Sequence, residues 1–205
     1  MIQNEASIND ISHALPTPLR QRIFASVVFY PTLAWSYLLG RILKTRHWWD
    51  DIDSNVIVGA YPFKRDAEPL YNQGVRAVVN TCEEYVGPVS EYNRLGIEQL
   101  RIPTTDFTHP RLRDVTKAVE FIQSHVEQGH KVYIHCKAGR ARSATVALCW
   151  LVKHRGLSPA EAQARLLQSR PHVNPRLTDR QVVKDFTTQL AQRCGLENTG
   201  RVGNG

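Results

Sequence analysis

The stretch VYIHCKAGRARSATVALCWLVKH, residues 132–154, carries the strongest structural signal in the chain. It opens with an apolar, β-branched run that ends at His135, passes through a short loop containing Gly139, and continues as an apolar helix from near Ser143. The pattern predicts a strand, a glycine loop and a helix N-terminus in succession. Such a loop binds anions, because its backbone N–H groups point inward and the helix dipole adds partial positive charge.

The loop begins with Cys136, and a cysteine near a helix N-terminus and an arginine has a pKa lowered to about 3.5–7.5. The sequence therefore predicts a thiolate nucleophile. Arg142 follows six residues later, where it closes the loop around one tetrahedral oxyanion and clamps two of its oxygens. Ser143 is predicted to offer its hydroxyl to the Cys136 sulfur, and His135 to orient the loop by hydrogen bonds. The rest of the loop is predicted to bind the substrate phosphate: Lys137, Ala138, Gly139, Arg140 and Ala141.

The other cysteines are interpreted as structural. Cys149 faces an apolar helix and Cys82 ends a strand, and a buried cysteine is more often inert core than nucleophile. Four cysteines are too few and too widely spaced for a disulfide scaffold, so free thiols in a reducing compartment are expected. The eight histidines form no H-E-x-x-H or H-x-H pattern, so neither a metal nor a cofactor is predicted.

Outward from the loop, short apolar runs alternate with amphipathic stretches, which is typical of an α/β domain. The candidate strands are 56–60, 75–82, 98–102 and 131–135. The candidate helices are 112–127, 143–154, 159–169 and 179–193. Two of the helix starts carry capping boxes: Ser158 with Glu161, and Thr178 with Gln181. One domain over residues 47–194 follows.

The ends of the chain have a different composition. Residues 1–22 are polar and are predicted to be disordered, and residues 195–205 are predicted to form a flexible tail. Residues 23–40 carry no charge and would make a helix of about 27 Å, just short of the roughly 30 Å hydrocarbon core of a bilayer. The segment 23–46 is therefore interpreted as a membrane-anchoring or targeting segment, with a hydrophobic helix packed on the domain as the alternative.

The positive charge of the chain is concentrated. Twenty-six Lys and Arg residues against 19 Asp and Glu residues give a net charge of +7, yet residues 131–180 alone hold ten basic and two acidic residues. The excess lies in and after the loop, and it predicts an anionic substrate and an anionic surface that carries it. No helix-turn-helix, zinc-finger or RNA-stacking pattern indicates nucleic acid as that polyanion.

Asp106 is the candidate proton donor. Phosphoryl transfer through a cysteinyl phosphate needs an acid for the leaving oxygen and then a base for water, and one carboxyl can serve both. Asp106 lies in IPTTDFTHP, residues 102–110, between a predicted strand and a predicted helix. A turn or capping role is the alternative for this residue, and Asp114, inside the helix, is the rival acid.

HCKAGRARS, residues 135–143, resembles the H-C-x5-R-S/T signature of the cysteine-dependent protein tyrosine and dual-specificity phosphatases. Five further segments resemble the mitochondrial PTP-like phosphatidylglycerophosphate phosphatases of that superfamily: FYPTL at 29–33, HWWDDID at 47–53, VGAYP at 58–62, CEEY at 82–85 and LGIEQLRIPTTDFT at 95–108. The chain departs from the subfamily at Ala141, where a serine is frequent, and at Val86, where an acidic residue is frequent.

This resemblance implies a central twisted mixed β-sheet flanked by helices, with the Cys-x5-Arg loop between a strand and a helix. It implies that Asp106 is the acid on a mobile loop. It also implies that three residues after a strand support the phosphate loop by pairing with its arginines: Glu83, Glu84 and Tyr85. Lys137 and Arg140 make this loop more basic than those of tyrosine-specific members, as in members that act on lipid phosphates. Solvated surface charge is the alternative for either residue.

The implied activity is dephosphorylation of phosphatidylglycerophosphate to phosphatidylglycerol in cardiolipin biosynthesis, at the mitochondrial inner membrane. Its partners would be an anionic phospholipid and a membrane surface. Phosphoproteins carrying phosphotyrosine or phosphothreonine, or phosphoinositides, are alternative substrates for the same chemistry. A non-catalytic phosphate-binding pseudophosphatase is the further alternative, and the presence of all four predicted catalytic residues stands against it: Cys136, Arg142, Ser143 and Asp106.

Overall fold

Strand β5 lies at the centre of a five-stranded sheet in the computed structural model, which describes residues 47–200 and the side chains of residues 47–193. The strand order is β1-β2-β5-β3-β4; β1 pairs antiparallel with β2, and the other pairs are parallel. The sheet is therefore mixed, as predicted. The strands are β1 Trp49–Asp51, β2 Val56–Gly59, β3 Val75–Cys82, β4 Glu98–Thr104 and β5 Lys131–His135.

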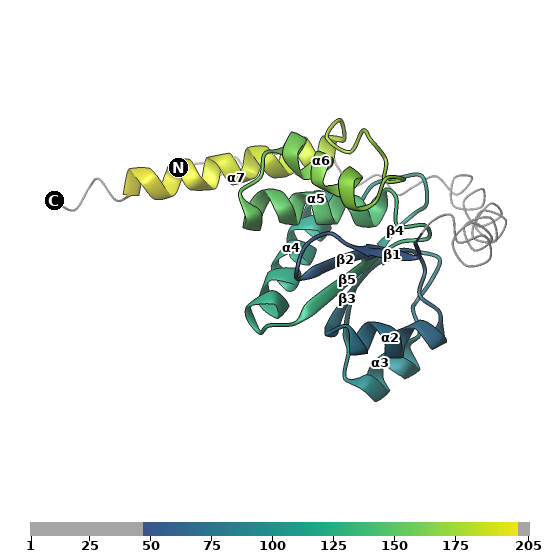
Figure 1. Cartoon of the computed structure of the whole chain (residues 1–205). Helices are drawn as coiled ribbons and strands as arrows, with labels where there is room; N and C mark the ends of the chain where they lie inside the picture. Colours follow the sequence, from purple (N-terminus) through teal and green to yellow (C-terminus); the bar gives the residue numbers. More distant parts are fainter. Residues whose placement is uncertain (1–46, 201–205) are drawn as a thin grey trace, which may run out of the picture.

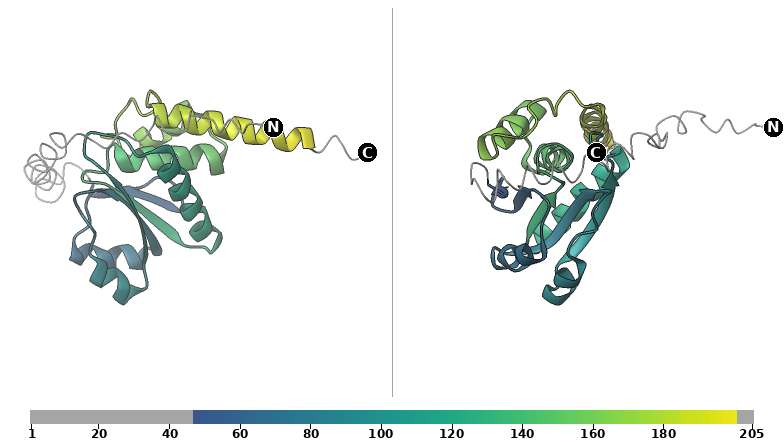
Figure 2. Two further views of the ribbon diagram at one scale, coloured as in Figure 1. Left: turned by 180° about the vertical axis from the view of Figure 1, so that it is seen from behind. Right: turned by 90° about the vertical axis from the view of Figure 1, so that its right-hand side faces the viewer.

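Helices cover both faces of the sheet. Helices α4 to α7 lie on one side and α2 and α3 on the other (Figure 1), and two further views show the same layers (Figure 2). The far end of α7 extends beyond the rest of the described fold. The helices are η3 Lys64–Asp66, α2 Ala67–Asn72, α3 Val89–Leu95, α4 Leu112–Glu127, α5 Arg142–Arg155, α6 Pro159–Ser169 and α7 Gln181–Gly200.

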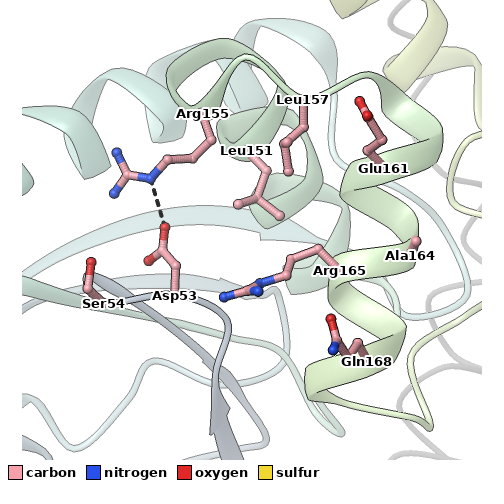
Figure 3. A pocket seen from close by; sticks show the side chains of 9 residues that line it. All are labelled: Asp53, Ser54, Leu151, Arg155, Leu157, Glu161, Ala164, Arg165 and Gln168. Carbon is pink, nitrogen blue, oxygen red and sulfur yellow. Dashed lines mark hydrogen bonds and ion pairs between the residues drawn. The ribbon is translucent and has the colours of Figure 1, made fainter.

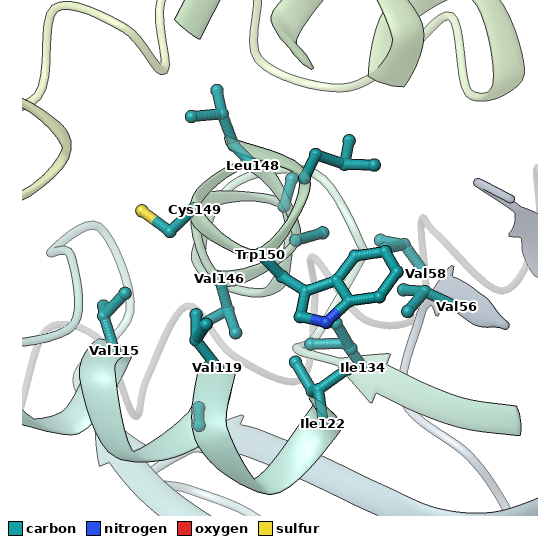
Figure 4. Packing of buried hydrophobic residues seen from close by; sticks show 14 of the residues in the cluster. Val56, Val58, Val115, Val119, Ile122, Ile134, Val146, Leu148, Cys149 and Trp150 are labelled. Carbon is teal, nitrogen blue, oxygen red and sulfur yellow. The ribbon is translucent and has the colours of Figure 1, made fainter. Parts of the chain in front are cut away.

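The alternation of side chains along the strands divides the core into two clusters. On β5, Ile134 belongs to the larger cluster with α4 and α5, whereas Tyr133 belongs to the smaller cluster with α2 and α3. Trp150 of α5 is fully buried in the larger cluster, against side chains from the sheet and from α4 (Figure 4). Burial on both faces is what a predominantly parallel sheet requires, and it holds β5 and α5 in fixed relative positions.

This topology brings three loops to one edge of the sheet. The carboxyl ends of parallel strands lie at the same edge, and in open α/β sheets ligands bind outside that edge. The loop after β5 holds residues 136–141, the loop after β3 holds residues 83–88, and the loop after β4 holds residues 105–111. All the predicted site residues lie in these loops or directly beside them.

The predicted elements agree closely with the structure where local signals are strong. The strands 75–82 and 131–135 and the helices 112–127 and 159–169 have the predicted bounds. Ser158 caps α6, with its hydroxyl accepting from the Glu161 N–H and the Glu161 carboxylate accepting from the Ser158 N–H. Strand β1, the 3-10 turn and helices α2 and α3 were not among the predicted elements.

The second predicted capping box is wrong. Helix α7 begins at Gln181, so Thr178 lies three residues before its first helical residue. A turn precedes the helix, in which the Arg180 N–H donates to the Leu177 carbonyl at 3.1 Å. The helix also continues past the predicted end at residue 193 to Gly200, so the predicted flexible tail falls partly within α7.

The predicted arm at residues 1–46 lies outside the described residues, as do residues 201–205. Within the described range, no helix is both long and apolar enough to cross a membrane.

Candidate active site

The loop between β5 and α5 surrounds the sulfur of Cys136. The Gly139 N–H donates to this sulfur at 3.2 Å, and the Ser143 hydroxyl donates to it at 3.3 Å. The predicted contact between Ser143 and Cys136 is therefore confirmed. Both donors stabilise a negative charge on the sulfur, since each places a positive hydrogen against it.

The electrostatic surroundings favour the Cys136 thiolate. Burial by itself raises the pKa of this thiol, but the positive charge of Arg142 and the hydrogen bonds from Ser143 outweigh burial and lower it to about 7. Burial raises the pKa of Cys149 to about 12 and raises that of Cys82 strongly. These two are free, buried thiols in the described part of the chain, as predicted, and Cys136 is the cysteine whose surroundings favour ionisation.

Gly139 is required by the shape of the loop. Its φ of +66° lies in the left-handed region, and a Cβ atom at this position would lie 2.5 Å from the carbonyl carbon of Gly59 at the end of β2. The loop thus packs directly against the neighbouring strand, with the Gly139 N–H pointing at the sulfur. A side chain here would displace the backbone that forms the anion cradle.

Arg142 is held in place by the loop after β3 and by the last residue of β4. Its Nη1 donates to Glu84 Oε2 at 2.9 Å and to the Thr104 carbonyl at 2.6 Å. Its Nη2 lies 3.1 Å from Asp106 Oδ1, although not in hydrogen-bonding alignment. Because the side chain is buried and held from two sides, the guanidinium is preorganised beside Cys136.

Asp106, the predicted acid, lies next to the phosphate loop. Its backbone N–H donates to Glu84 Oε1 at 3.0 Å, and its carboxylate pairs with Lys137 and faces Arg142. The rival acid, Asp114, lies in the first turn of α4, 3.5 Å from Arg113. The structure therefore joins Asp106, and not Asp114, to the ion pairs of the loop. Lys137, predicted as a substrate contact, is buried and paired with this acid.

The three predicted supporting residues act in different ways. Glu84 makes the predicted pair with Arg142. Glu83 accepts a hydrogen bond from the Thr105 hydroxyl at 2.5 Å, which ties the loop after β3 to the acid loop. Tyr85 stacks on Tyr61 with ring centroids 3.6 Å apart and donates its hydroxyl to the Pro62 carbonyl. Tyr85 therefore fixes the neighbouring loop through ring packing rather than through the predicted arginine pair.

The structure shows the predicted hydrogen bonding of His135 at its main chain rather than at its ring. Both ring nitrogens are buried without a hydrogen-bond partner, and burial lowers the pKa of His135 to about 3, so the ring is neutral. The ring stacks on Tyr133, with centroids 5.7 Å apart and planes at 23°. The backbone carbonyl of His135 accepts from the Thr81 hydroxyl at 2.9 Å. His135 thus positions the start of the loop by packing and by its main chain.

Comparison with known proteins decides the family. The profile of the dual specificity phosphatase catalytic domain matches residues 56–189. The chain belongs to the dual specificity phosphatase family. The phosphatidylglycerophosphate phosphatase PTPMT2 of Arabidopsis thaliana is 38% identical over 164 residues, covering 78% of this phosphatase and 72% of the relative. The human phosphatidylglycerophosphatase and protein-tyrosine phosphatase 1 is 35% identical over 192 residues, covering 89% of this chain and 96% of the relative.

Solved structures agree with this assignment. The crystal structure of PTPMT1 matches with a TM-score of 0.66 and 34% identity, covering 72% of this phosphatase and 99% of that chain. The crystal structure of PTPMT1 in complex with PI(5)P matches with the same TM-score and 33% identity. The predicted fold and family are confirmed, and the protein is a cysteine-dependent phosphatase.

Arg170 is a supporting residue of this phosphatase that sequence reasoning missed. It is 1% exposed at the end of α6, and its guanidinium donates to the Gly139 carbonyl at 2.9 Å and to the Ala138 carbonyl at 3.1 Å. Asp50 of β1 pairs with the same guanidinium. Arg170 therefore turns these two carbonyls outward, which leaves the N–H groups facing the anion. Nothing local marks this residue, because its partners are distant in the sequence.

Arg140, which was predicted to contact substrate, is exposed, and its Nε donates to the His172 carbonyl at 2.7 Å. Its own carbonyl accepts from the Asn174 N–H at 2.8 Å. Arg140 thus connects the phosphate loop to the segment between α6 and α7.

A pocket of about 540 Å³ lies away from this chemistry, between the turn after β1 and helices α5 and α6 (Figure 3). Within it, Arg155 pairs with Asp53 at 2.9 Å, and the Arg165 Nε donates to the Ile52 carbonyl. None of the predicted site residues lines it. The active site is therefore defined by the phosphate loop and not by this pocket.

Proposed function

We propose that this phosphatase removes the terminal phosphate of phosphatidylglycerophosphate through a cysteinyl-phosphate intermediate. The observation that carries the proposal is the arrangement of three side chains: a Cys136 thiol whose pKa is lowered to about 7, the Arg142 guanidinium that lowers it, and Asp106, 3.1 Å from that guanidinium. The choice of substrate is supported by the names of relatives that match most of the chain, from Arabidopsis thaliana and Homo sapiens.

In the first step, the Cys136 thiolate attacks phosphorus and the bond to the glycerol oxygen breaks. The N–H groups of the loop and the Arg142 guanidinium stabilise the charge on the equatorial oxygens, where most catalysis of phosphoryl transfer resides. Asp106 gives its proton to the departing alkoxide, which is a poor leaving group without it. The products are the cysteinyl phosphate and the free alcohol.

In the second step, water attacks the cysteinyl phosphate and the sulfur leaves as a thiolate. Asp106, now a carboxylate, takes a proton from the water. The Ser143 hydroxyl, 3.3 Å from the sulfur, stabilises the departing thiolate. Inorganic phosphate is released and the cycle returns to its start.

A phosphoinositide is the second candidate substrate. A PTPMT1 structure with 33% identity to this chain was solved in complex with PI(5)P. The two lipids share a phosphomonoester attached to an anionic phospholipid headgroup, so the same cradle fits both. The human relative's name also includes protein-tyrosine phosphatase activity, so a phosphotyrosine peptide is the third candidate substrate to be tested.

The membrane is the proposed source of the substrate. The exposed large hydrophobic side chains of the described residues are Val86, Val89 and Phe107, with exposures of 53%, 42% and 65%. All three lie in or beside the loops after β3 and β4, at the edge of the sheet that holds Cys136. We call them the apolar rim. Exposed apolar groups beside a basic site suit an anionic bilayer surface, and we propose the mitochondrial inner membrane as that surface from the family resemblance.

The test compares three substrates with one enzyme. Phosphatidylglycerophosphate and PI(5)P in vesicles and a phosphotyrosine peptide are each offered to the full chain, in EDTA, and phosphate release is measured. We expect the highest kcat/KM on phosphatidylglycerophosphate and no turnover of any substrate by Cys136→Ser. A higher kcat/KM on PI(5)P or on the peptide would contradict the proposed substrate, and full activity of Cys136→Ser would contradict the mechanism.

A further inference from the structure

Arg180 is a cation beside the active site to which neither the sequence motifs nor the proposed mechanism gives a role. Its backbone is fixed on both sides: its N–H donates to Leu177, and its carbonyl accepts from the N–H groups of Val183 and Lys184 at the start of α7. The segment before it is attached to the phosphate loop by the Asn174 N–H, which donates to the Arg140 carbonyl. The backbone position from which the Arg180 side chain extends is therefore well fixed.

A short relay connects the Arg180 side chain to the phosphate loop. Its Nη1 donates to Thr145 Oγ1 at 2.9 Å, and this hydroxyl donates in turn to the Ala141 carbonyl at 2.8 Å. Thr145 follows Arg142 by three residues on α5, a rise of about 4.5 Å along the helix axis. The Arg180 guanidinium thus contacts the first turn of α5, the turn that begins with Arg142.

The charge of Arg180 is not neutralised within the described side chains. Arg142, Lys137 and Arg170 each have a carboxylate partner, whereas Arg180 has no ion pair with a carboxylate among residues 47–193. Burial lowers the pKa of Arg180, and the Cys136 thiolate opposes that shift. A guanidinium has five N–H donors, so the bond to Thr145 leaves donors for an anion.

Arg180 also faces the acid loop. His109, which follows Asp106 on that loop, has a pKa lowered by burial and further by the charge of Arg180. The charge of Arg180 thus acts on His109 of the acid loop and on Cys136 of the phosphate loop, and its bond to Thr145 holds it beside the start of α5. An anion carried by the substrate just outside the reacting phosphate would meet it there.

We infer that Arg180 binds the phosphodiester of the substrate headgroup and so selects substrates that carry a second phosphate beside the phosphomonoester. The inference rests on the proposed function. In phosphatidylglycerophosphate one glycerol unit separates the two phosphates, so the diester stays close to the phosphate loop while Arg142 holds the monoester. A guanidinium can donate two parallel hydrogen bonds to two phosphate oxygens, which makes it selective for this group.

The experiment uses two soluble monoesters, so that membrane binding does not enter. One is the deacylated headgroup, glycerophosphoglycerophosphate, which has the monoester and the diester; the other is glycerol 3-phosphate, which has the monoester alone. The variant is Arg180→Gln in the full chain. The matched control is Arg176→Gln, since Arg176 is an exposed arginine of the same segment. kcat/KM is measured for each enzyme on each substrate.

We expect Arg180→Gln to lower kcat/KM on the deacylated headgroup by roughly tenfold or more, the range of a lost charge-assisted hydrogen bond. On glycerol 3-phosphate the same variant should stay within about twofold of wild type, a difference below the size of one such bond. The Arg176→Gln control should match wild type on both substrates.

Two outcomes overturn the inference while leaving the proposed function intact. Equal losses on both substrates would show that Arg180 only positions the loop through Thr145, and an unchanged rate on the headgroup would show that the diester binds elsewhere. A wild-type enzyme that fails to hydrolyse the headgroup and phosphatidylglycerophosphate, yet hydrolyses the phosphopeptide, would instead remove the proposed function and the inference with it.

Discussion

The reactivity of Cys136 comes from a balance between burial and charge. Burial disfavours a thiolate, and two other cysteines in the described core have raised pKa values for that reason. Cys136 differs because the positive charge of Arg142 favours its thiolate and the Ser143 hydroxyl donates to its sulfur. The surroundings therefore favour the thiolate of Cys136 and the neutral thiols of Cys82 and Cys149. The cause of this difference is the loop that follows β5.

This balance predicts the pH dependence of alkylation. The thiolate reacts with iodoacetamide, and since the favourable charge lowers the pKa of Cys136 to about 7, labelling should increase as the pH rises through 7. Ser143→Ala removes one donor, so its inflection should lie at higher pH. Mass spectrometry of the labelled peptide gives the rate, with Cys136→Ser as the blank. An inflection at the ordinary pKa of a cysteine would contradict the role of the loop.

The acid role of Asp106 predicts a dependence on the leaving group. Asp106→Asn should lower kcat on an alkyl phosphate by about 10²–10⁴-fold, the usual contribution of general acid catalysis. The loss on para-nitrophenyl phosphate should be much smaller, because a nitrophenolate leaves without a proton. Arg170→Lys is the matched control: it weakens the support of the phosphate-loop carbonyls without contacting Asp106, and should therefore affect both substrates similarly. Equal losses in Asp106→Asn would show that Asp106 is not the acid.

At the scale of elements, the site depends on contacts between segments that are far apart in sequence. Arg170 at the end of α6 holds the carbonyls of the phosphate loop and pairs with Asp50 of β1. The loop after β3 holds the acid loop through Glu83 and Glu84. The cradle keeps its shape because three neighbouring elements fix it, in addition to its own sequence.

Arg170→Lys tests this support without removing the charge. A lysine has one compact ammonium in place of the planar fork, so it cannot donate to both carbonyls and to Asp50 together. We expect a loss of about 1–3 kcal/mol in the free energy of unfolding by urea, and a lower kcat on para-nitrophenyl phosphate. Arg165→Lys, on the same helix but bonded to Ile52, is the control for activity. A folded Arg170→Lys enzyme with wild-type kcat would contradict the role.

Features that depend on neighbouring residues in the sequence could be predicted, whereas features that depend on contacts between distant segments could not. Elements with complete local signals were predicted correctly: the strand 131–135 from its β-branched run, and α6 from Ser158 and Glu161. The pattern at Thr178 failed because a turn bonded through Leu177 delays the helix. Cys136 and Arg142 form one local motif and could be found, whereas Arg170 and the stacking of His135 depend on tertiary neighbours that no local pattern encodes.

At the scale of the whole molecule, several basic residues and the exposed large apolar side chains of the described residues lie at the edge of the sheet that holds Cys136. The chain carries +7 overall, and residues 131–180 hold ten basic residues against two acidic ones. Much of this charge is paired inside the fold, at Lys137, Arg142 and Arg170. The apolar rim, Val86, Val89 and Phe107, lies at the same edge. The combination predicts that this edge of the phosphatase faces the bilayer.

The rim prediction is tested with Val86→Ser combined with Val89→Ser in the full chain. Burying a valine side chain contributes roughly 1.5 kcal/mol or more, so partial insertion of two predicts about tenfold lower activity on phosphatidylglycerophosphate in anionic vesicles. Activity on the deacylated headgroup should be unchanged, because neither valine takes part in the hydrogen bonds to the Cys136 sulfur, which come from Gly139 and Ser143. Added salt should lower the vesicle rate of both enzymes, since the basic residues still attract the anionic surface. A vesicle rate equal to wild type would assign membrane binding to another part of the chain, of which the uncharged segment 23–40 is the first candidate.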